Sequence, residues 1–269
     1  MDGVRVARWW SAGCDRAKRH LAPGLQRAWR GASDLLFSPD CLLCGRELPP
    51  AEASQPQLCG TCLDQLVVGE QPVCRRCACP VPQFWPASER CPRCRNRTYR
   101  FRHTVSVGFY RDAMQQTVLW MKQPVHEPLA HTMGLVLADR LRACFTKCDW
   151  DCIVPVPMHW WRRLRRGVHP ARVLAEALGQ QLAIPVAKSL LQCRRPVRKQ
   201  GTLSPAERQR NVRNAFRTSA AYDINDQHIL LVDDIMTTGA TASEAARMLR
   251  RAGARGVTVA VVARGLGRS

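Results

Sequence analysis

The stretch HILLVDDIMTTGATASEAARMLRRAG, from His228 to Gly253, decides the fold of this chain. Its apolar run from Ile229 to Val232 is typical of a strand buried on both faces, and helix-forming residues with an apolar stripe begin at Ala242. Between them, small residues and one glycine let the backbone close around an anion. Loop N–H groups, threonine hydroxyls and the positive end of the helix dipole would meet its charge. The stretch therefore predicts a strand, a phosphate-binding loop and a helix.

Two adjacent acids, Asp233 and Asp234, follow the apolar run directly. Like charges repel at the end of a buried strand unless something compensates them, as sugar hydroxyls or a magnesium ion would. The pair therefore suits a ribose 5-phosphate, whose phosphate we expect on Thr237, Thr238, Gly239, Ala240 and Thr241. No Gly-Lys-Ser/Thr loop and no G-x-G-x-x-G motif opens the helix, which argues against nucleoside triphosphates and dinucleotides. The plainer alternative is a turn whose threonines only cap the helix.

Strand-like and helix-like runs alternate from about residue 100 onward, with this stretch among them, which is typical of a parallel α/β sheet. The expected strands are His103 to Tyr110, Cys152 to Pro157, His228 to Val232 and Gly256 to Ala263. The expected helices are Met114 to Lys122, Leu129 to Phe145, Ala171 to Leu182 and Thr241 to Ala252. The fold class that follows is α/β.

Cysteines dominate the segment from residue 41 to 95, which holds nine of the chain's fourteen. Eight form four Cys-x-x-Cys pairs: Cys41 and Cys44, Cys59 and Cys62, Cys74 and Cys77, Cys91 and Cys94. Two such pairs complete one tetrahedral zinc site, so eight thiolates predict two closed, structural zinc ions. Gaps of 14, 11 and 13 residues favour sequential pairing over an interleaved one. Cys79 is a possible substitute ligand, and free or redox-active thiols are the alternative.

Length, charge and hydropathy indicate the expected location and domain organisation of the chain. The chain has 269 residues and a formal charge of +20, and no apolar stretch approaches the roughly 20 residues that cross a bilayer. Its first residues show no apolar core of a secretory signal, so we expect a cytoplasmic protein without membrane insertion. We expect a basic helical arm over residues 1–38, a double zinc-ribbon module over 39–98 and an α/β domain over 99–269.

The motif VDDIMTTGAT resembles the phosphoribosyl-pyrophosphate (PRPP) signature of type I phosphoribosyltransferases. Two further stretches resemble the ComF family, which joins a Cys-rich zinc module to a phosphoribosyltransferase domain and is associated with DNA uptake and natural competence. They are CDWDCIVPVPMHWWRRLRRGVHPARVLAEAL, from Cys148, and RKQGTLSPAERQRNVRNAF, from Arg198. The resemblance runs from about Leu36 to Arg264 and implies that residues 99–269 form a type I phosphoribosyltransferase domain with that family's fold. Val168, His169 and Pro170 depart from the family's aromatic-Asn-Gln pattern.

The same resemblance implies roles for further residues. A pyrophosphate loop would span residues 155–167, and a mobile segment at about 194–214 would close over the reaction. Asp233, Asp234, Arg166 and Lys199 would be catalytic, with magnesium bridging pyrophosphate and ribose oxygens. Pyrophosphate would meet Arg165, Arg166, Gly167, Lys199, Gln200 and Arg208. Lys122 also fits the family's spacing.

Residues 160–217 are strongly basic, with fourteen Lys and Arg against two Asp and Glu, a net +12. Trp160 and Trp161 lie beside Arg162 and Arg163, a combination that suits neutralisation of a nucleic-acid backbone and base stacking. These four residues are therefore candidates for binding single-stranded DNA. A solvated basic face and tryptophans that pack in the core are the alternatives.

Together these patterns predict a ComF-like protein that binds PRPP and single-stranded DNA and acts in DNA uptake or in the use of imported DNA. Proteins of the DNA-uptake machinery are then expected partners. Two alternatives stay open. The chain is a catalytically inactive, PRPP-sensing DNA-binding protein, or it is a nucleobase-salvage phosphoribosyltransferase whose zinc module serves as the specificity hood.

Overall fold

The computed structural model describes residues 40–49, 56–69, 71–86, 88–147, 149–159, 167–195 and 205–267. Within 205–209, only the side chain of Glu207 is described. The chain from Asp40 onward forms one compact unit. The predicted basic arm over residues 1–38 lies outside the described residues, as do Trp160, Trp161, Arg162, Arg163, Arg165, Arg166, Lys199 and Gln200.

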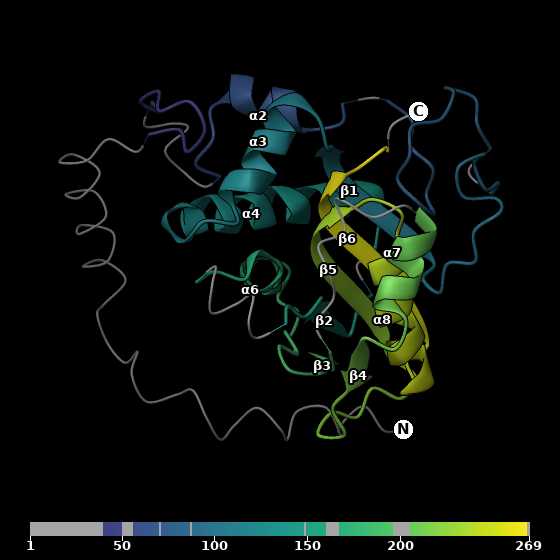
Figure 1. Cartoon of the computed structure of the whole chain (residues 1–269). Helices are drawn as coiled ribbons and strands as arrows, with labels where there is room; N and C mark the ends of the chain where they lie inside the picture. The colour runs from purple at the N-terminus through teal and green to yellow at the C-terminus, as the bar shows by residue number, and fades with distance from the viewer. Residues whose placement is uncertain are drawn as a thin grey trace, which may run out of the picture. The chain divides into compact units, whose positions relative to one another are not determined.

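A four-stranded parallel sheet forms the centre of the unit, in the order β1-β6-β5-β2 (Figure 1). Its strands are β1 (His103–Phe109), β2 (Cys152–Pro155), β5 (His228–Met236) and β6 (Gly256–Arg264). All nine residues of β6 are buried, and its sequence GVTVAVVAR is almost wholly apolar. Such continuous apolar runs are expected when a parallel sheet is covered on both faces.

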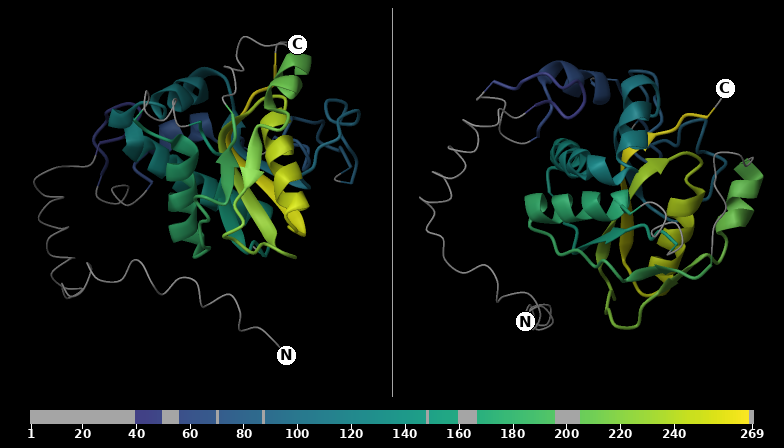
Figure 2. Two further views of the ribbon diagram at one scale, coloured as in Figure 1. Left: turned by 60° about the horizontal axis from the view of Figure 1, so that its bottom comes forward. Right: turned by 60° about the vertical axis from the view of Figure 1, so that its left-hand side comes forward.

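Helices cover both faces of this sheet. Helices α4 (Glu127–Cys144) and α6 (Pro170–Leu182) lie on one side and α8 (Ala240–Arg251) on the other (Figure 2). Side chains of β5 alternate between the two layers, so that Leu230 joins the core with α4 and α6 while Leu231 joins the core with α8. This alternation follows from the two-residue period of a strand.

Smaller elements complete the described unit. They are α2 (Gly60–Leu66), α3 (Asp112–Trp120), the 3₁₀ turn η1 (Pro124–His126), α7 (Pro205–Val212) and an antiparallel pair, β3 (Leu191–Cys193) with β4 (Phe216–Thr218). No helix in the described ranges combines the length and apolar character needed to cross a bilayer.

The expected strands and helices are confirmed, and the type I phosphoribosyltransferase fold with an N-terminal zinc module is the fold observed. The largest boundary error is at β5, which does not end at Val232 but continues through both acids to Met236. Its pairing with β6 extends from Asp233 opposite Val261 to Met236 opposite Arg264, so ladder hydrogen bonds outweigh the low strand propensity of Asp. Strand β2 ends two residues earlier than predicted, and α3 begins and ends two residues earlier. Elements α2, α7, β3 and β4 were not predicted, because short elements carry little periodic signal.

The Cys-rich segment covers the free edge of the sheet at β1. The N–H of Val68 donates to the carbonyl of Val107 at 2.8 Å, and the N–H of Thr104 donates to the carbonyl of Arg75 at 2.9 Å. A Cβ at Gly108 would lie 2.0 Å from the Leu66 carbonyl oxygen, so only glycine permits this close approach. The contacts satisfy edge groups that would otherwise template association.

Candidate functional site: two thiol clusters and a phosphate loop

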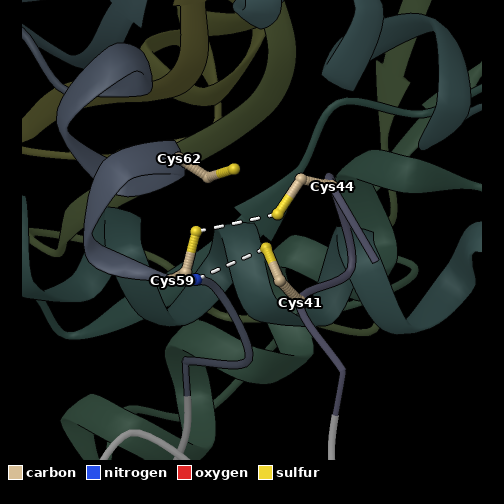
Figure 3. Close-up of side chains that lie close together, drawn as sticks. All are labelled: Cys41, Cys44, Cys59 and Cys62. Carbon is tan, nitrogen blue, oxygen red and sulfur yellow. Dashed lines mark hydrogen bonds between the residues drawn. The ribbon is translucent and has the colours of Figure 1, made fainter. Parts of the chain in front are cut away.

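Four thiols from the first two Cys-x-x-Cys pairs, Cys41, Cys44, Cys59 and Cys62, point toward one another (Figure 3). Their sulfur atoms all lie within 4.8 Å of one another. The Sγ atoms of Cys44 and Cys59 are 3.8 Å apart, and the N–H of Cys59 donates to Cys41 Sγ at 3.4 Å. A disulfide would need about 2.05 Å, so these thiols are not oxidised pairs.

The third and fourth pairs form a second, fully buried cluster of Cys74, Cys77, Cys91 and Cys94. Their Sγ separations are 3.8 Å between Cys74 and Cys94, 3.4 Å between Cys77 and Cys91, and 3.7 Å between Cys91 and Cys94. Tetrahedral zinc with bonds of about 2.3 Å places its sulfur ligands about 3.8 Å apart. Both clusters therefore fit zinc, and the predicted sequential pairing is confirmed.

Crowded thiols need a cation to ionise together. Hydrogen bonding to the neighbouring Cys74 raises the pKa of Cys77, and burial raises the pKa of Cys94 to about 12. By contrast, the hydrogen bond from Cys77 lowers the pKa of Cys74 to about 4. A divalent metal removes this conflict, since it binds all four as thiolates. All four positions are taken by protein, so such a metal is structural.

Cys79, the possible substitute ligand, lies outside both clusters. It is fully buried, and its sulfur accepts a hydrogen bond from Arg264 Nη2 at 3.1 Å. The second cluster is complete without Cys79.

The predicted phosphate loop occupies the turn between β5 and α8. Gly239 has a left-handed backbone, with φ of +76°, and stands at the N-cap of α8. Thr238 Oγ1 accepts a hydrogen bond from the N–H of Ala240 at 3.3 Å. Ala240 and Thr241 belong to the first helical turn rather than to a free loop. A cavity of about 20 Å³ lies inside this turn, lined by Asp233, Ile235, Met236, Thr237, Gly239, Ala240, Thr241, Ala242 and Val261.

Asp233 and Asp234 stand at the carboxyl end of β5, partly buried and beside this turn. The pKa of Asp233 is raised well above its ordinary value, first by burial and then by the negative charge of Asp234. Lys122 Nζ lies 3.2 Å from Asp234 Oδ2 and supplies the one positive charge that contacts the pair in the described part of the chain. The sequence showed that Lys122 fits the family's spacing but did not indicate its contact with Asp234.

Two residues that sequence analysis did not single out, Tyr99 and Arg264, donate hydrogen bonds to backbone carbonyls of the turn. Tyr99 donates its hydroxyl to the Thr238 carbonyl at 3.0 Å, and its ring lies 2.8 Å from where a Gly239 Cβ would be. Arg264 is 4% exposed, and its guanidinium reaches both the turn and the second thiol cluster. It donates to the carbonyls of Met236, Thr237, Gly265 and Cys77. The sequence signal for Arg264 was its position as a charged residue at the end of an otherwise apolar strand.

Most of the remaining predicted site residues lie outside the residues that the structure describes. Gly167 is described, with φ of +71°, and a Cβ there would approach Pro124 Cγ to 3.0 Å. Arg208 lies on α7, but its side chain is not described. The departures from the family pattern have local roles: Val168 is buried, a ring nitrogen of His169 hydrogen-bonds the Val156 carbonyl at 3.1 Å, and Pro170 begins α6.

Asp233→Asn is expected to stabilise the ligand-free protein at pH 7. In the unfolded chain Asp233 ionises above its ordinary pKa of 3.8, whereas in the folded protein its raised pKa keeps it protonated to higher pH. The folded protein therefore loses stability as pH rises above about 4. Asparagine keeps the acceptor for the Asp234 N–H and removes the charge. Single substitutions typically change stability by about 0.5 to 3 kcal/mol, and 1 kcal/mol corresponds to roughly 2 to 4 °C in a chain of this size, so we expect a Tm increase of a few degrees.

Scanning calorimetry at pH 7 and pH 4 measures this effect. The gain should disappear at pH 4, and Asp64→Asn, an exposed substitution on α2, should show neither change. A lower Tm for Asp233→Asn at pH 7 would contradict the assignment.

Two family models match the chain. The Phosphoribosyl transferase domain matches residues 164–268, and the Double zinc ribbon domain matches residues 32–95. The second match contains all eight clustered cysteines, and the first contains the turn with both acids. Among solved structures, a purine phosphoribosyltransferase from Pyrococcus horikoshii is 20% identical and covers 49% of this chain and 70% of its own, with a TM-score of 0.29.

Curated relatives match over most of the chain. Competence protein F from Haemophilus influenzae is 27% identical over 239 residues, which cover 85% of this chain and 98% of the relative. DNA utilization protein YhgH from Escherichia coli K12 is 29% identical over 219 residues, which cover 76% of this chain and 95% of the relative.

Proposed function

Since the chain belongs to the ComF family, in which a double zinc ribbon precedes a phosphoribosyltransferase domain, we propose that it binds PRPP and single-stranded DNA. Its role would be DNA uptake or the use of imported DNA in the cytoplasm, in contact with the DNA-uptake machinery. The printed names of its relatives, competence protein F and DNA utilization protein, support this role.

One observation carries the PRPP proposal: two carboxylates lie in the last four residues of β5, and one of them, Asp233, lines the cavity of the turn that begins α8. The 5-phosphate would bind the N–H groups and hydroxyls of the turn from Thr237 to Thr241, where the positive end of the α8 dipole adds to its stabilisation. Asp233 and Asp234 would accept hydrogen bonds from the ribose hydroxyls or hold hydrated magnesium. Either ligand would offset the burial and the repulsion from Asp234 that together raise the pKa of Asp233.

Lys122 deepens this proposal. In the ligand-free protein its ammonium group already contacts Asp234 at 3.2 Å, so it places a positive charge against the acidic pair. The pyrophosphate of the donor would meet Arg165, Arg166, Gly167, Lys199, Gln200 and Arg208, as the family resemblance implies. With PRPP bound, magnesium would supply positive charge against pyrophosphate.

The catalytic question separates three forms of the proposal. A phosphoribosyltransferase would release pyrophosphate in the presence of its acceptor, with Asp233, Asp234, Arg166 and Lys199 in the catalytic roles. A sensor would bind PRPP and DNA and release none. A salvage enzyme would release pyrophosphate with a free nucleobase and without DNA. Pyrophosphate release measured with bases, with single-stranded DNA and with neither distinguishes them.

Binding itself is tested by thermal denaturation of the zinc-loaded chain. At 100 times its Kd, PRPP with magnesium should stabilise the protein by about 2.7 kcal/mol, which raises Tm by roughly 5 to 10 °C. Ribose 5-phosphate should give a smaller increase, because it lacks the pyrophosphate contacts. No increase at millimolar PRPP would contradict the proposal.

A further inference from the structure

A groove of about 840 Å³ lies beside the phosphate turn and is lined by α8 and the end of α7. Three segments line it: residues 96–100, which follow the last zinc knuckle, residues 210–214 at the end of α7, and residues 238–251, which comprise the turn and α8. The groove shares Ala240 with the small cavity of the turn. Its wall therefore comes from both the zinc module and the phosphoribosyltransferase domain.

The charge of this groove is almost entirely positive. One acid, Glu244, faces six arginines: Arg97, Arg100, Arg210, Arg213, Arg247 and Arg251. Glu244 is already engaged, since it accepts hydrogen bonds from Arg247 at 2.7 and 2.9 Å and from the N–H of Asn214 at 2.7 Å. One arginine is thereby balanced and five positive charges remain, so the lining can compensate several negative charges at once.

Three of these arginines offer free guanidinium groups. Arg100, Arg210 and Arg251 are exposed, and none of them forms an ion pair with another residue in the described ranges. Each comes from a different wall of the groove. An anion in the groove would therefore meet arginines from all three sides without breaking an existing salt bridge.

The groove follows one face of α8 along almost the whole helix. Ala240, Glu244, Arg247 and Arg251 are spaced by three or four residues, so they share one face of α8. At 1.5 Å per residue, the distance from Ala240 to Arg251 is about 17 Å. A groove of this length with arginines on three walls suits a polymer with regularly spaced phosphates better than one small anion.

The polar lining indicates which part of a nucleic acid would bind. Tyr99, the one aromatic side chain that the structure places in this lining, is only 8% exposed, stacks on Phe101 at 4.7 Å and uses its hydroxyl on Thr238. It therefore offers no face to a base, whereas asparagine, threonine and serine side chains offer hydrogen bonds to phosphate and sugar.

We propose that this groove binds the sugar-phosphate backbone of single-stranded DNA without reading its sequence. The inference rests on the proposed function and gives the DNA a second contact surface, distinct from the predicted stretch Trp160 to Arg163. Base stacking would then fall to the tryptophans, and backbone neutralisation to the groove. The DNA would run beside the PRPP site, since both lie against the same turn.

The test is fluorescence anisotropy of the full zinc-loaded chain with a labelled 20-nucleotide oligothymidine over a range of NaCl concentrations. In the triple variant Arg100→Ala, Arg210→Ala and Arg251→Ala, affinity should fall at least about tenfold at low salt. The slope of log K against log salt should become shallower by about two, since each single-strand phosphate contact contributes about 0.7. The control variant, Arg111→Ala, Lys147→Ala and Arg217→Ala, loses the same charge at exposed sites outside the groove and should change affinity less than about threefold.

Each outcome decides one claim. If the wild type does not bind the oligonucleotide, the DNA part of the proposed function fails. If the wild type binds and the two triple variants weaken binding equally, the groove proposal fails. Tighter binding of a duplex of the same length, or equal competition by polyglutamate, would overturn the assignment to single strands. Zinc content and Tm verify folding, and single Arg100→Ala and Arg251→Ala variants replace the triple variant if it unfolds.

Discussion

Replacing Cys77 and Cys94 with alanine is expected to unfold the second half of the zinc module and to destabilise the whole chain. Structural zinc contributes on the order of 10 kcal/mol to the folding of small zinc-binding peptides. Losing two of the four ligands therefore removes a free energy comparable to the whole stability of a typical domain. The effect should spread, because the Cys77 carbonyl accepts a 2.6 Å hydrogen bond from Arg264, which also holds the phosphate turn.

Zinc analysis and thermal denaturation measure this prediction. Zinc should fall from two ions per chain to one, and the cooperative transition should shift down by more than 10 °C or disappear, given roughly 2 to 4 °C per kcal/mol. Cys144→Ala is the matched control, since that exposed thiol belongs to neither cluster. Two ions retained in the double variant would contradict the closed four-thiolate site.

The double variant Asp233→Asn with Asp234→Asn is expected to lower PRPP affinity at least about 100-fold. Both side chains keep their shape but lose the negative charge that would hold ribose hydroxyls or magnesium. Hydrogen bonds to charged groups are worth about 1.5 to 3 kcal/mol each, so two losses exceed about 3 kcal/mol. Asp234→Asn also removes the ion pair with Lys122, so the Tm of the ligand-free double variant is measured to show that weaker binding does not reflect unfolding.

A PRPP titration followed by Tm measures the change. Asp64→Asn with Asp226→Asn removes the same charge from two exposed positions and should leave the response to PRPP unchanged. A Kd in the Asp233 and Asp234 variant within threefold of the wild type would contradict the ribose assignment.

Local patterns made the thiol clusters and the phosphate turn predictable. A Cys-x-x-Cys pair defines half of a metal site within four residues, and near-equal gaps favoured joining neighbours, as both clusters confirm. The strand, turn and helix around Asp233 are likewise contiguous in sequence, so their order could be predicted even though the end of β5 was placed four residues too early.

Contacts between distant segments could not be predicted in this way. Arg264 reaches the Cys77 carbonyl across 187 positions, and Tyr99 reaches the Thr238 carbonyl across 139. Neither contact leaves a periodic or spacing signal, because each depends on how the zinc module packs against the sheet. The arginine groove has the same origin: its three walls come together only in the fold, while sequence reasoning placed the DNA-binding candidates in the charge-dense run from Trp160 to Arg163.

The central claim is that the carboxyl end of β5 and the start of α8 form a PRPP site. Isothermal titration calorimetry of PRPP with magnesium, on the zinc-loaded wild type and on the Asp233→Asn and Asp234→Asn double variant, tests it most directly. We expect saturable binding of one PRPP per chain in the wild type and none in the variant at the same concentrations. No saturable heat in the wild type, or equal affinity in both proteins, would contradict it.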